Sequence, residues 1–178
     1  MLYEFKKEGK GKYVEIDADL EGVLFCIRAL SKDKEDFRPH VKYLRVEDNT
    51  LVGTNGGRLH AYKLERELPD GWYKALASTK RYAAIYHDVS IQGDYPKWQD
   101  LLPDPESIDW TKAFFIDPDK ALDAAVYKIN TKLDKCVNIG FVKDLGASFQ
   151  VDINSDDRIY AESGNLQAII MPMVQPSM

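Results

Sequence analysis

The sequence has little of what metal sites and catalytic sites are usually built from. Its 178 residues include only two cysteines, Cys26 and Cys136, and no CxxC or Cys/His spacing accompanies them. This argues against a disulfide framework or a zinc site and favours a reducing, cytoplasmic setting. The three histidines, His40, His60 and His87, form no HExxH or His-x-His pattern, and no GxSxG sequence presents a serine nucleophile. We therefore expect no cofactor, no metal and no enzymatic activity.

Long apolar runs and an excess of positive charge are also missing. No run of about 18 apolar residues, the length that a membrane span needs, occurs, and the first residues have no apolar stretch long enough for a signal peptide. The net charge is −5 and the pI about 5.3, which argues against a protein that coats nucleic acid with its whole surface. We expect no membrane partner, and phosphate contacts confined to a local patch.

What is present is enough apolar sequence for one sizeable core. Hydrophobic residues make up 44% of the chain and charged residues 30%, which is typical of one globular domain or two very small ones. The stretch from Gly93 to Pro105 is rich in proline and turn-forming residues and predicts an ordered linker. We predict a single domain over residues 1–178, with a first repeat at about 12–92, the linker at 93–111 and a second repeat at about 112–175.

The repeat is visible as a short echo in the sequence. VEIDAD at 14–19 recurs a hundred residues later as FFIDPD at 114–119, and each copy predicts a strand that leads into a helix. Asp17 and Asp117 can accept hydrogen bonds from a first helical turn, and Pro118 suits the first helical position. The helical spacing of apolar residues then predicts two core-facing stripes: Leu20, Val23, Leu24, Ile27 and Leu30 in the first helix, and Leu122, Ala125, Val126, Ile129 and Leu133 in the second.

Strand-like segments follow both helices. They lie at 41–46, 51–54 and 58–64 in the first half and at 137–142, 148–153, 158–162 and 167–173 in the second. Asn55-Gly56 predicts a tight hairpin turn, and residues 154–157 occupy the corresponding place. Segments 72–76 and 82–86 are predicted as strands, and a short helix is the alternative for 82–86. The predicted fold class is α+β, a duplicated strand-helix-antiparallel-strands unit with two helices packed on antiparallel sheet.

Three motifs, met in order along the chain, carry a resemblance to a known family. Arg38-Pro39-His40-Val41 with GTNGGRL at 53–59 resembles an Arg-Pro segment followed by an Ala-Thr-Asp-Gly-His-Arg-Leu hairpin. GDYPKWQDLLP at 93–103 is similar to a Gly-x-Phe-Pro-x-Tyr-x-x-x-Ile-Pro connector, and AIIMPM at 168–173 to a closing Tyr-Val-Val-Met-Pro-Met strand. This is the pattern of the bacterial DNA sliding clamps, the β subunit of DNA polymerase III. Asn55, Gly57 and Val174 depart from it, since the family has Asp, His and Arg there.

The resemblance implies a DNA-clamp-like fold and a non-catalytic role. Clamps of this family form a ring around double-stranded DNA, contact its backbone without reading sequence, and hold a polymerase or another replication protein through a short linear peptide. Carried over by motif, the peptide-binding residues here are Thr54, Gly56, Gly57, Arg58, Leu59, Met171, Pro172 and Met173.

Helical spacing supplies the candidate DNA-binding residues. On the second helix, cations lie opposite or beside the apolar stripe, whereas the first helix offers mainly one cation and an uncharged outer side of Gly22, Phe25, Cys26 and Ala29 that suggests packing against another subunit. An ordinary solvated helix face explains the second helix equally well, because Asp119, Asp123 and Asp134 flank the same lysines. The candidate residues are Lys120, Lys128, Lys132, Lys135 and Arg28.

Three functions therefore stay open at this stage. The first is a homo-oligomeric accessory clamp for replication or repair; a clamp subunit has three domains, so a ring would need about six one-domain copies of this chain. The second is a peptide-binding interaction module without DNA in its centre. The third and least favoured is a small hydrolase that uses acid-rich turns such as Asp156-Asp157.

Overall fold

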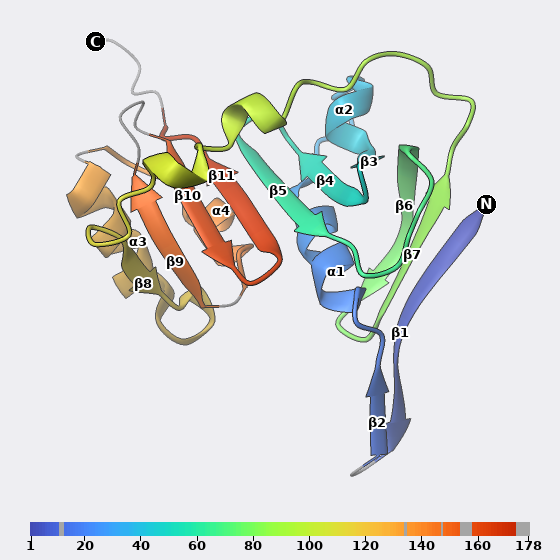
Figure 1. Ribbon diagram of the computed structural model, residues 1–178, viewed down its shortest axis with the longest axis horizontal. Coiled ribbons are helices and arrows are strands. Elements are labelled where there is room, and N and C mark those ends of the chain that lie inside the picture. Colours follow the sequence, from blue (N-terminus) through green and yellow to red (C-terminus); the bar gives the residue numbers. More distant parts are fainter. Residues whose placement is uncertain (11–12, 134, 147, 154–157, 174–178) are drawn as a thin grey trace. The chain divides into compact units, whose positions relative to one another are not determined.

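A computed structural model describes residues 1–178 except 11–12, 134, 147, 154–157 and 174–178 (Figure 1). Its contacts divide the chain into two compact units, unit 1 from Met1 to Pro96 and unit 2 from Lys97 to Met178. Among the described residues, no helix has both the length and the apolar composition that crossing a bilayer requires.

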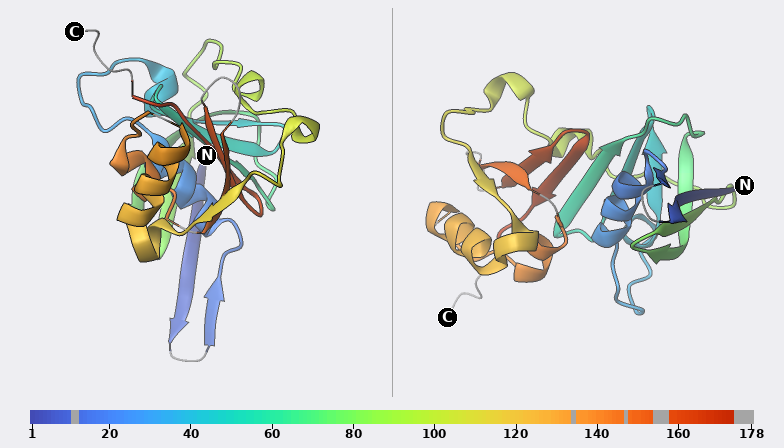
Figure 2. Two further views of the ribbon diagram at one scale, coloured as in Figure 1. Left: turned by 90° about the vertical axis from the view of Figure 1, so that its left-hand side faces the viewer. Right: turned by 90° about the horizontal axis from the view of Figure 1, so that it is seen from below.

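Unit 1 is an antiparallel sheet with one long helix on it. The strands that the structure describes run in the order β2-β1-β7-β6-β3-β4-β5, and β1 pairs with β7 through its first half and with β2 through its second. The β1–β2 hairpin therefore projects beyond the other strands (Figures 1 and 2). The elements are β1 (Leu2–Lys10), β2 (Tyr13–Ile16), α1 (Leu20–Ala29), α2 (Pro39–Lys42), β3 (Leu44–Glu47), β4 (Thr50–Thr54), β5 (Arg58–Lys63), β6 (Gly71–Thr79) and β7 (Tyr82–His87).

Helix α1 packs closely on β4 and β5. A Cβ at Gly53 would overlap the Cys26 carbonyl oxygen, so a glycine on the strand allows the helix backbone to approach. The Cys26 thiol donates a hydrogen bond to the Leu51 carbonyl over 3.2 Å. The predicted core stripe of α1 is confirmed in part, because Leu20, Val23 and Leu30 are buried and Leu24 and Ile27 are partly buried. The predicted outer face was wrong: Gly22, Phe25, Cys26 and Ala29 are buried in the core of their own unit. Small residues there permit the short helix-to-sheet distance, and periodicity alone does not reveal this.

Two buried polar side chains fix α1 to the strands beneath it. The Asp19 carboxylate, 1% exposed, accepts hydrogen bonds from the Tyr62 hydroxyl (3.1 Å) and from the backbone N–H groups of Glu65 (2.8 Å) and Arg66 (3.0 Å). His60 Nδ1 lies 2.7 Å from the Phe25 carbonyl oxygen, and its ring stacks on that of Phe25. Burial lowers the pKa of His60 from 6.5 to about 3, so the imidazole stays neutral.

Unit 2 repeats part of the element order of unit 1, a strand, a helix, a short helix and three strands, on a smaller sheet. Its described strands follow the order β11-β10-β9-β8, all antiparallel, and the helices lie on one face of it (Figure 1). The elements are η1 (Gln99–Leu101), η2 (Pro105–Ser107), β8 (Phe114–Ile116), α3 (Pro118–Leu133), α4 (Ile139–Lys143), β9 (Phe149–Ile153), β10 (Ile159–Ser163) and β11 (Leu166–Ile170).

Helix α3 matches its predicted stripe. Ala125, Ile129 and Leu133 are buried, and Leu122 and Val126 are partly buried. Asp117 Oδ1 accepts a hydrogen bond from the Lys120 backbone N–H over 3.2 Å, which confirms the predicted cap. The backbone at Ala121 is non-helical, so the first turn is offset from the rest.

Three other local predictions need correction. The helix after Asp17 begins at Leu20 with Asp19 at its cap position; Asp17 accepts from the Asp19 N–H and pairs with Arg66 instead. Segment 41–46 is split between α2 and β3. Segment 137–142, predicted as a strand, holds the helix α4, which Asn138 caps by accepting from the Gly140 N–H. Strand β1 was not predicted, and the turn at 154–157 lies outside the described residues.

The fold class is α+β with antiparallel sheet, as the sequence predicts. The remaining predicted strands are present as β4, β5, β6, β7, β9, β10 and β11, with ends shifted by a few residues. The residues predicted as a linker contain η1 and η2, and Trp98 in this stretch is buried.

Candidate nucleic-acid and peptide interface

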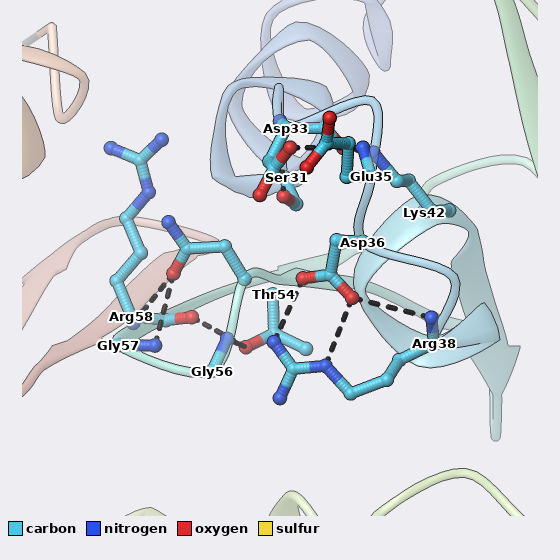
Figure 3. Close-up of polar contacts among 11 residues, drawn as sticks. Ser31, Asp33, Glu35, Asp36, Arg38, Lys42, Thr54, Gly56, Gly57 and Arg58 are labelled. Carbon is cyan, nitrogen blue, oxygen red and sulfur yellow. Dashed lines mark hydrogen bonds and ion pairs between the residues drawn. The ribbon is translucent and has the colours of Figure 1, made fainter.

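The first candidate segment is the turn between β4 and β5. Thr54 Oγ1 donates to the Arg58 carbonyl over 2.5 Å and accepts from the Gly56 N–H, while Asn55 Oδ1 accepts from the N–H groups of Gly57 and Arg58 (Figure 3). Gly56 has a φ of +88°, a conformation that favours glycine. The turn is thus stabilised by its own side chains, and Asn55 fills the position of the family's Asp with the same acceptor oxygen.

Burial separates the turn residues into two groups. Gly56 is exposed and Gly57 half-buried, so a ligand can approach the surface of the turn, although both N–H groups are bonded within it. Thr54, Arg58 and Leu59 are 8%, 5% and 3% exposed. The Arg58 guanidinium donates to the Arg28 carbonyl at the end of α1. Its observed role is therefore within unit 1, and a ligand contact at Leu59 would require that side chain to become accessible.

A guanidinium that sequence reasoning did not assign lies beside this turn. Arg38 donates to Asp36 through Nε (3.0 Å) and Nη2 (2.8 Å), and the pair stands next to Gly56 (Figure 3). A Cβ added at Gly56 would lie 3.8 Å from Arg38 Nη1. The hydrogen bonds from Arg38 lower the pKa of Asp36 to about 2, so the carboxylate stays charged at neutral pH. The Arg-Pro motif was the only sequence signal for Arg38, and it does not show the contact with Gly56, which lies 18 positions later in the chain.

An exposed aromatic residue precedes this arginine. Phe37 is 88% exposed, and the Arg38 side chain is 58% exposed. The loop that carries both is held at its ends, where the Ser31 N–H donates to the Val41 carbonyl over 2.8 Å and the Lys42 ammonium donates to the Asp33 carbonyl. Unit 1 thus carries an exposed apolar ring one residue before an exposed guanidinium that lies beside Gly56, while the N–H groups of Gly56 and Gly57 are bonded within the turn.

The second candidate segment follows β11 in unit 2. Met171 and Pro172 are half-buried, and Met173 is 52% exposed. The Met173 N–H donates to the Cys136 carbonyl over 2.8 Å, which ties the segment to the residues before α4. Val174, the departure from the family pattern, lies outside the described residues. The structure therefore describes the two halves of the candidate peptide site separately, each within its own unit.

Two of the predicted DNA-binding lysines make contacts within unit 2. Lys120 is 82% exposed but pairs with Asp117 at 2.8 Å. Lys128 donates to the Phe115 carbonyl over 3.2 Å and lies 5.0 Å from the centre of the Phe114 ring. Because β8 is an edge strand of its sheet, Lys128 covers a carbonyl that would otherwise be open to another strand.

The other candidate cations are less clearly grouped. Lys132 and Lys135 are exposed at the end of α3 and just beyond it, while Asp119 and Asp123 share the exposed side of that helix. Arg28 is half-buried, with its guanidinium 5.9 Å from the centre of the Phe25 ring. Helix α3 contains three lysines and two aspartates. Its exposed face is therefore only weakly basic.

The described residues offer little for metal binding or nucleophilic catalysis. In the described part of the chain, no group of three or more His, Cys, Asp and Glu side chains is placed to hold a metal ion. Cys26 is fully buried, and burial raises the pKa of its thiol, which disfavours the thiolate that a nucleophile needs. Asp156 and Asp157, the acids of the hydrolase hypothesis, lie outside the described residues.

Comparison with known proteins gives one consistent result. No family model and no curated protein matches the sequence. Solved structures do match: DNA polymerase III subunit β from Borrelia burgdorferi, in complex with a natural product, gives a TM-score of 0.58 at 14% identity. The Pseudomonas aeruginosa sliding clamp with a ligand gives 0.57 at 12%, and the Helicobacter pylori β clamp bound to a DNA ligase peptide gives 0.57 at 11%.

These matches cover nearly the whole chain but only part of each clamp. They extend over 98% of this chain and 64 to 66% of the three clamp chains. At such identities the likeness concerns the fold. The predicted resemblance is confirmed at that level: the chain is a distant, clamp-like protein with the fold of the bacterial DNA polymerase III β subunits.

Proposed function

We propose that the chain is a non-catalytic, sliding-clamp-like protein that tethers a polymerase or another replication or repair protein through a short peptide. The observation that carries this proposal is Arg38, which Asp36 fixes beside exposed Gly56 and which follows exposed Phe37 in the chain. The clamp-like fold supports it, as does the H. pylori neighbour, which is bound to a DNA ligase peptide.

The geometry suits a peptide with an apolar anchor and an acidic or carbonyl group. Asp36 engages Nε and Nη2 of Arg38, and in the described residues no acceptor contacts Nη1. A carboxylate or carbonyl of the peptide can accept from Nη1, while an apolar side chain packs on Phe37. Met171 and Met173 contribute adaptable apolar surface at their own segment, and thioether side chains suit this role.

A peptide titration tests the assignment. We expect Arg38→Ala to weaken binding of a fluorescent clamp-binding peptide about tenfold, the effect of one charge-assisted hydrogen bond. Arg81→Ala, at the β6–β7 turn of the same unit, is the matched control and should bind as the wild type does. Met171→Ala tests the second segment. Arg58→Ala is a poorer test, because Arg58 is bonded to the end of α1 and its loss would destabilise unit 1. Equal affinity of Arg38→Ala and wild type would remove this site.

DNA contact through α3 is a second, separate part of the proposal. Lys120, Lys128 and Lys132 are exposed on α3, with Lys132 at the margin of the stripe that contains buried Ala125 and Ile129, and exposed lysines can contact backbone phosphates. Replacement of Lys120, Lys128 and Lys135 by Glu should abolish salt-sensitive retention on double-stranded DNA. Retention that is unchanged in this variant would leave the lysines as solvated surface and favour the peptide-binding module without DNA.

Ring formation depends on the number of copies. The chain spans 64 to 66% of clamp chains, whose family has three domains per subunit. We therefore propose that it has the content of about two such domains, so that three copies would complete a six-domain ring, where the sequence alone suggested six. Native mass spectrometry distinguishes a trimer from a hexamer. A chain that stays monomeric at high concentration and is not retained on circular DNA would rule out the ring and leave the peptide-binding role.

A further inference from the structure

Unit 2 contains a cavity that the proposed function does not use. It has a volume of about 620 Å³ and lies between the strands β10 and β11 and the connector, by which we mean residues 97–111, which precede β8. This volume is within the range of sites for small molecules. The side chains that matter here are Gln99 and Asp104 at the connector, Trp110, and Tyr160, Glu162 and Gln167 on the strands.

The connector is held over the sheet by several independent contacts. Trp98 anchors it with only 6% of its surface exposed. Arg158 at the start of β10 donates to the Leu101 carbonyl over 3.4 Å, and Asp104 Oδ1 accepts from the Glu106 N–H at the start of η2. The connector and helix α3 lie on opposite faces of the unit 2 sheet (Figures 1 and 2). The cavity is therefore built by unit 2 alone, away from the lysines of α3.

A chain of hydrogen bonds orders the sheet side of the cavity. Gln167 Nε2 donates to the Tyr160 hydroxyl over 3.0 Å, and Tyr160 donates to Glu162 Oε2 over 2.7 Å. Tyr160 is 2% exposed, and burial raises its pKa, so the phenol remains a neutral donor. Glu162 is thus held in one orientation, and in the described residues no donor contacts its Oε1. One carboxylate oxygen of Glu162 remains for a ligand.

Charge and aromatic surface define what this cavity can bind. Its lining includes two carboxylates, those of Asp104 and Glu162, and among the described lining residues no Lys, Arg or His. Phosphates and carboxylates are therefore disfavoured. Trp110 is 36% exposed, and its ring centre lies 6.4 Å from that of Tyr160. An accessible indole and an oriented carboxylate that line one cavity can together attract a planar cation.

We propose that this cavity binds a guanidinium group, which stacks on Trp110 and donates to the Glu162 carboxylate. Guanidinium fits better than a simple ammonium because its planar fork can stack on an indole and bond a carboxylate edge together. The amide oxygen of Gln167, whose Nε2 bonds Tyr160, supplies a further acceptor for the remaining N–H groups of the guanidinium. The group can belong to a small molecule or to an arginine of a polypeptide; both present the same chemistry. The site stands independently of the peptide interface in unit 1.

Isothermal titration with matched ligands tests the charge requirement on the unmodified protein. N-acetyl-arginine amide should bind at least tenfold more tightly than N-acetyl-citrulline amide, in which a neutral urea of the same shape replaces the guanidinium. Equal binding of the two, or binding of neither, would overturn the proposal. Agmatine and a blocked Gly-Arg-Gly tripeptide identify the source: tighter binding of agmatine points to a small molecule, and tighter binding of the tripeptide to a polypeptide.

Variants then locate the site. Glu162→Gln keeps the shape and the bond from Tyr160 but removes the charge, and should weaken arginine amide binding about tenfold. Glu106→Gln makes the same charge change on the connector outside the cavity lining and should leave binding unchanged. Trp110→Leu should weaken binding severalfold. The comparison of the arginine and citrulline ligands uses the unmodified protein, so a folding defect in any of these variants does not affect that test. Loss of binding in Glu106→Gln equal to that in Glu162→Gln would contradict the assignment.

Discussion

The two units share an order of elements but differ in how the first strand joins the sheet. In unit 1 the order is strand, helix, short helix and a three-strand meander, β2-α1-α2-β3-β4-β5, and in unit 2 it is β8-α3-α4-β9-β10-β11. β8 pairs directly with β9 of its meander. β2 pairs with β1, and β1, β7 and β6 stand between it and β3. A similar local sequence thus forms a similar strand and helix, while the pairing partner is decided by residues outside the repeat.

The units also differ in how their helices are fixed. Among the described residues, the buried polar side chains Asp19, Thr54, Arg58 and His60 all belong to unit 1. There Asp19, Arg58 and His60 form the hydrogen bonds that join α1 to the strands on which it packs. In unit 2, α3 uses an apolar stripe, and its first-turn acid Asp119 is exposed. Asp19 and Asp119, which occupy equivalent positions in the repeated segments 14–19 and 114–119, therefore serve different purposes. Unit 1 depends on specific buried polar bonds and unit 2 on apolar packing.

The largest expected effect comes from these two equivalent aspartates. Asp19→Ala removes the acceptor of three hydrogen bonds and leaves buried donors without it, so we expect a loss of about 3 kcal/mol in the free energy of unfolding. Asp119→Ala should cost less than about 0.5 kcal/mol because that side chain is exposed. Urea denaturation measures both. Equal losses would show that the two positions are used alike.

A smaller effect is expected from acidification of unit 1. The pKa of His60 is lowered in the folded state, so folding disfavours its protonation, and stability is full above pH 6.5 and decreases as the pH falls toward 3. Between pH 7 and pH 5 this amounts to about 2 kcal/mol. The control His60→Leu removes the titrating group and should show a smaller decrease over the same range. A wild type and a variant that lose stability in parallel would rule out this role for His60.

The smallest expected effect on stability comes from modification of the two cysteines, one in each unit. Cys26 is on the buried side of α1, and Cys136 is exposed. A thiol reagent should modify Cys136 in the native protein with little change in stability, and Cys26 only after denaturant opens unit 1. Mass spectrometry of the labelled peptides reports each site. Equal labelling of both thiols in native buffer would contradict the packing of α1.

Much of the fold could be predicted because local signals agreed with the final structure. Asn55-Gly56 gave the β4–β5 turn, and the spacing of Ala125, Ile129 and Leu133 gave the core face of α3. The burial of the second side of α1, with Gly22, Cys26 and Ala29, could not be predicted, since it depends on the close approach of helix and strand at Gly53, which helical periodicity does not show. Strand β1 was missed because its alternation of charged and apolar residues is weak near the chain start.

The candidate site was predicted less completely than the fold. The family motifs indicated the turn at 54–59 and the segment at 171–173, but not Arg38, whose place beside Gly56 depends on the loop that folds back between α1 and β3. Likewise, no sequence pattern marks the cavity of unit 2, which needs the connector to lie against β10. We still predict, without a test so far, that the two repeats superpose and that both peptide segments act together.

The most direct test of the clamp-like role is a map of backbone amide shifts by nuclear magnetic resonance during titration with a clamp-binding peptide. We expect the largest changes at Gly56 and Gly57, with smaller ones at Phe37 and Arg38, and saturation at one peptide per chain. A peptide that binds without shifting the Gly56 and Gly57 signals, or that does not bind at all, would contradict the proposed function.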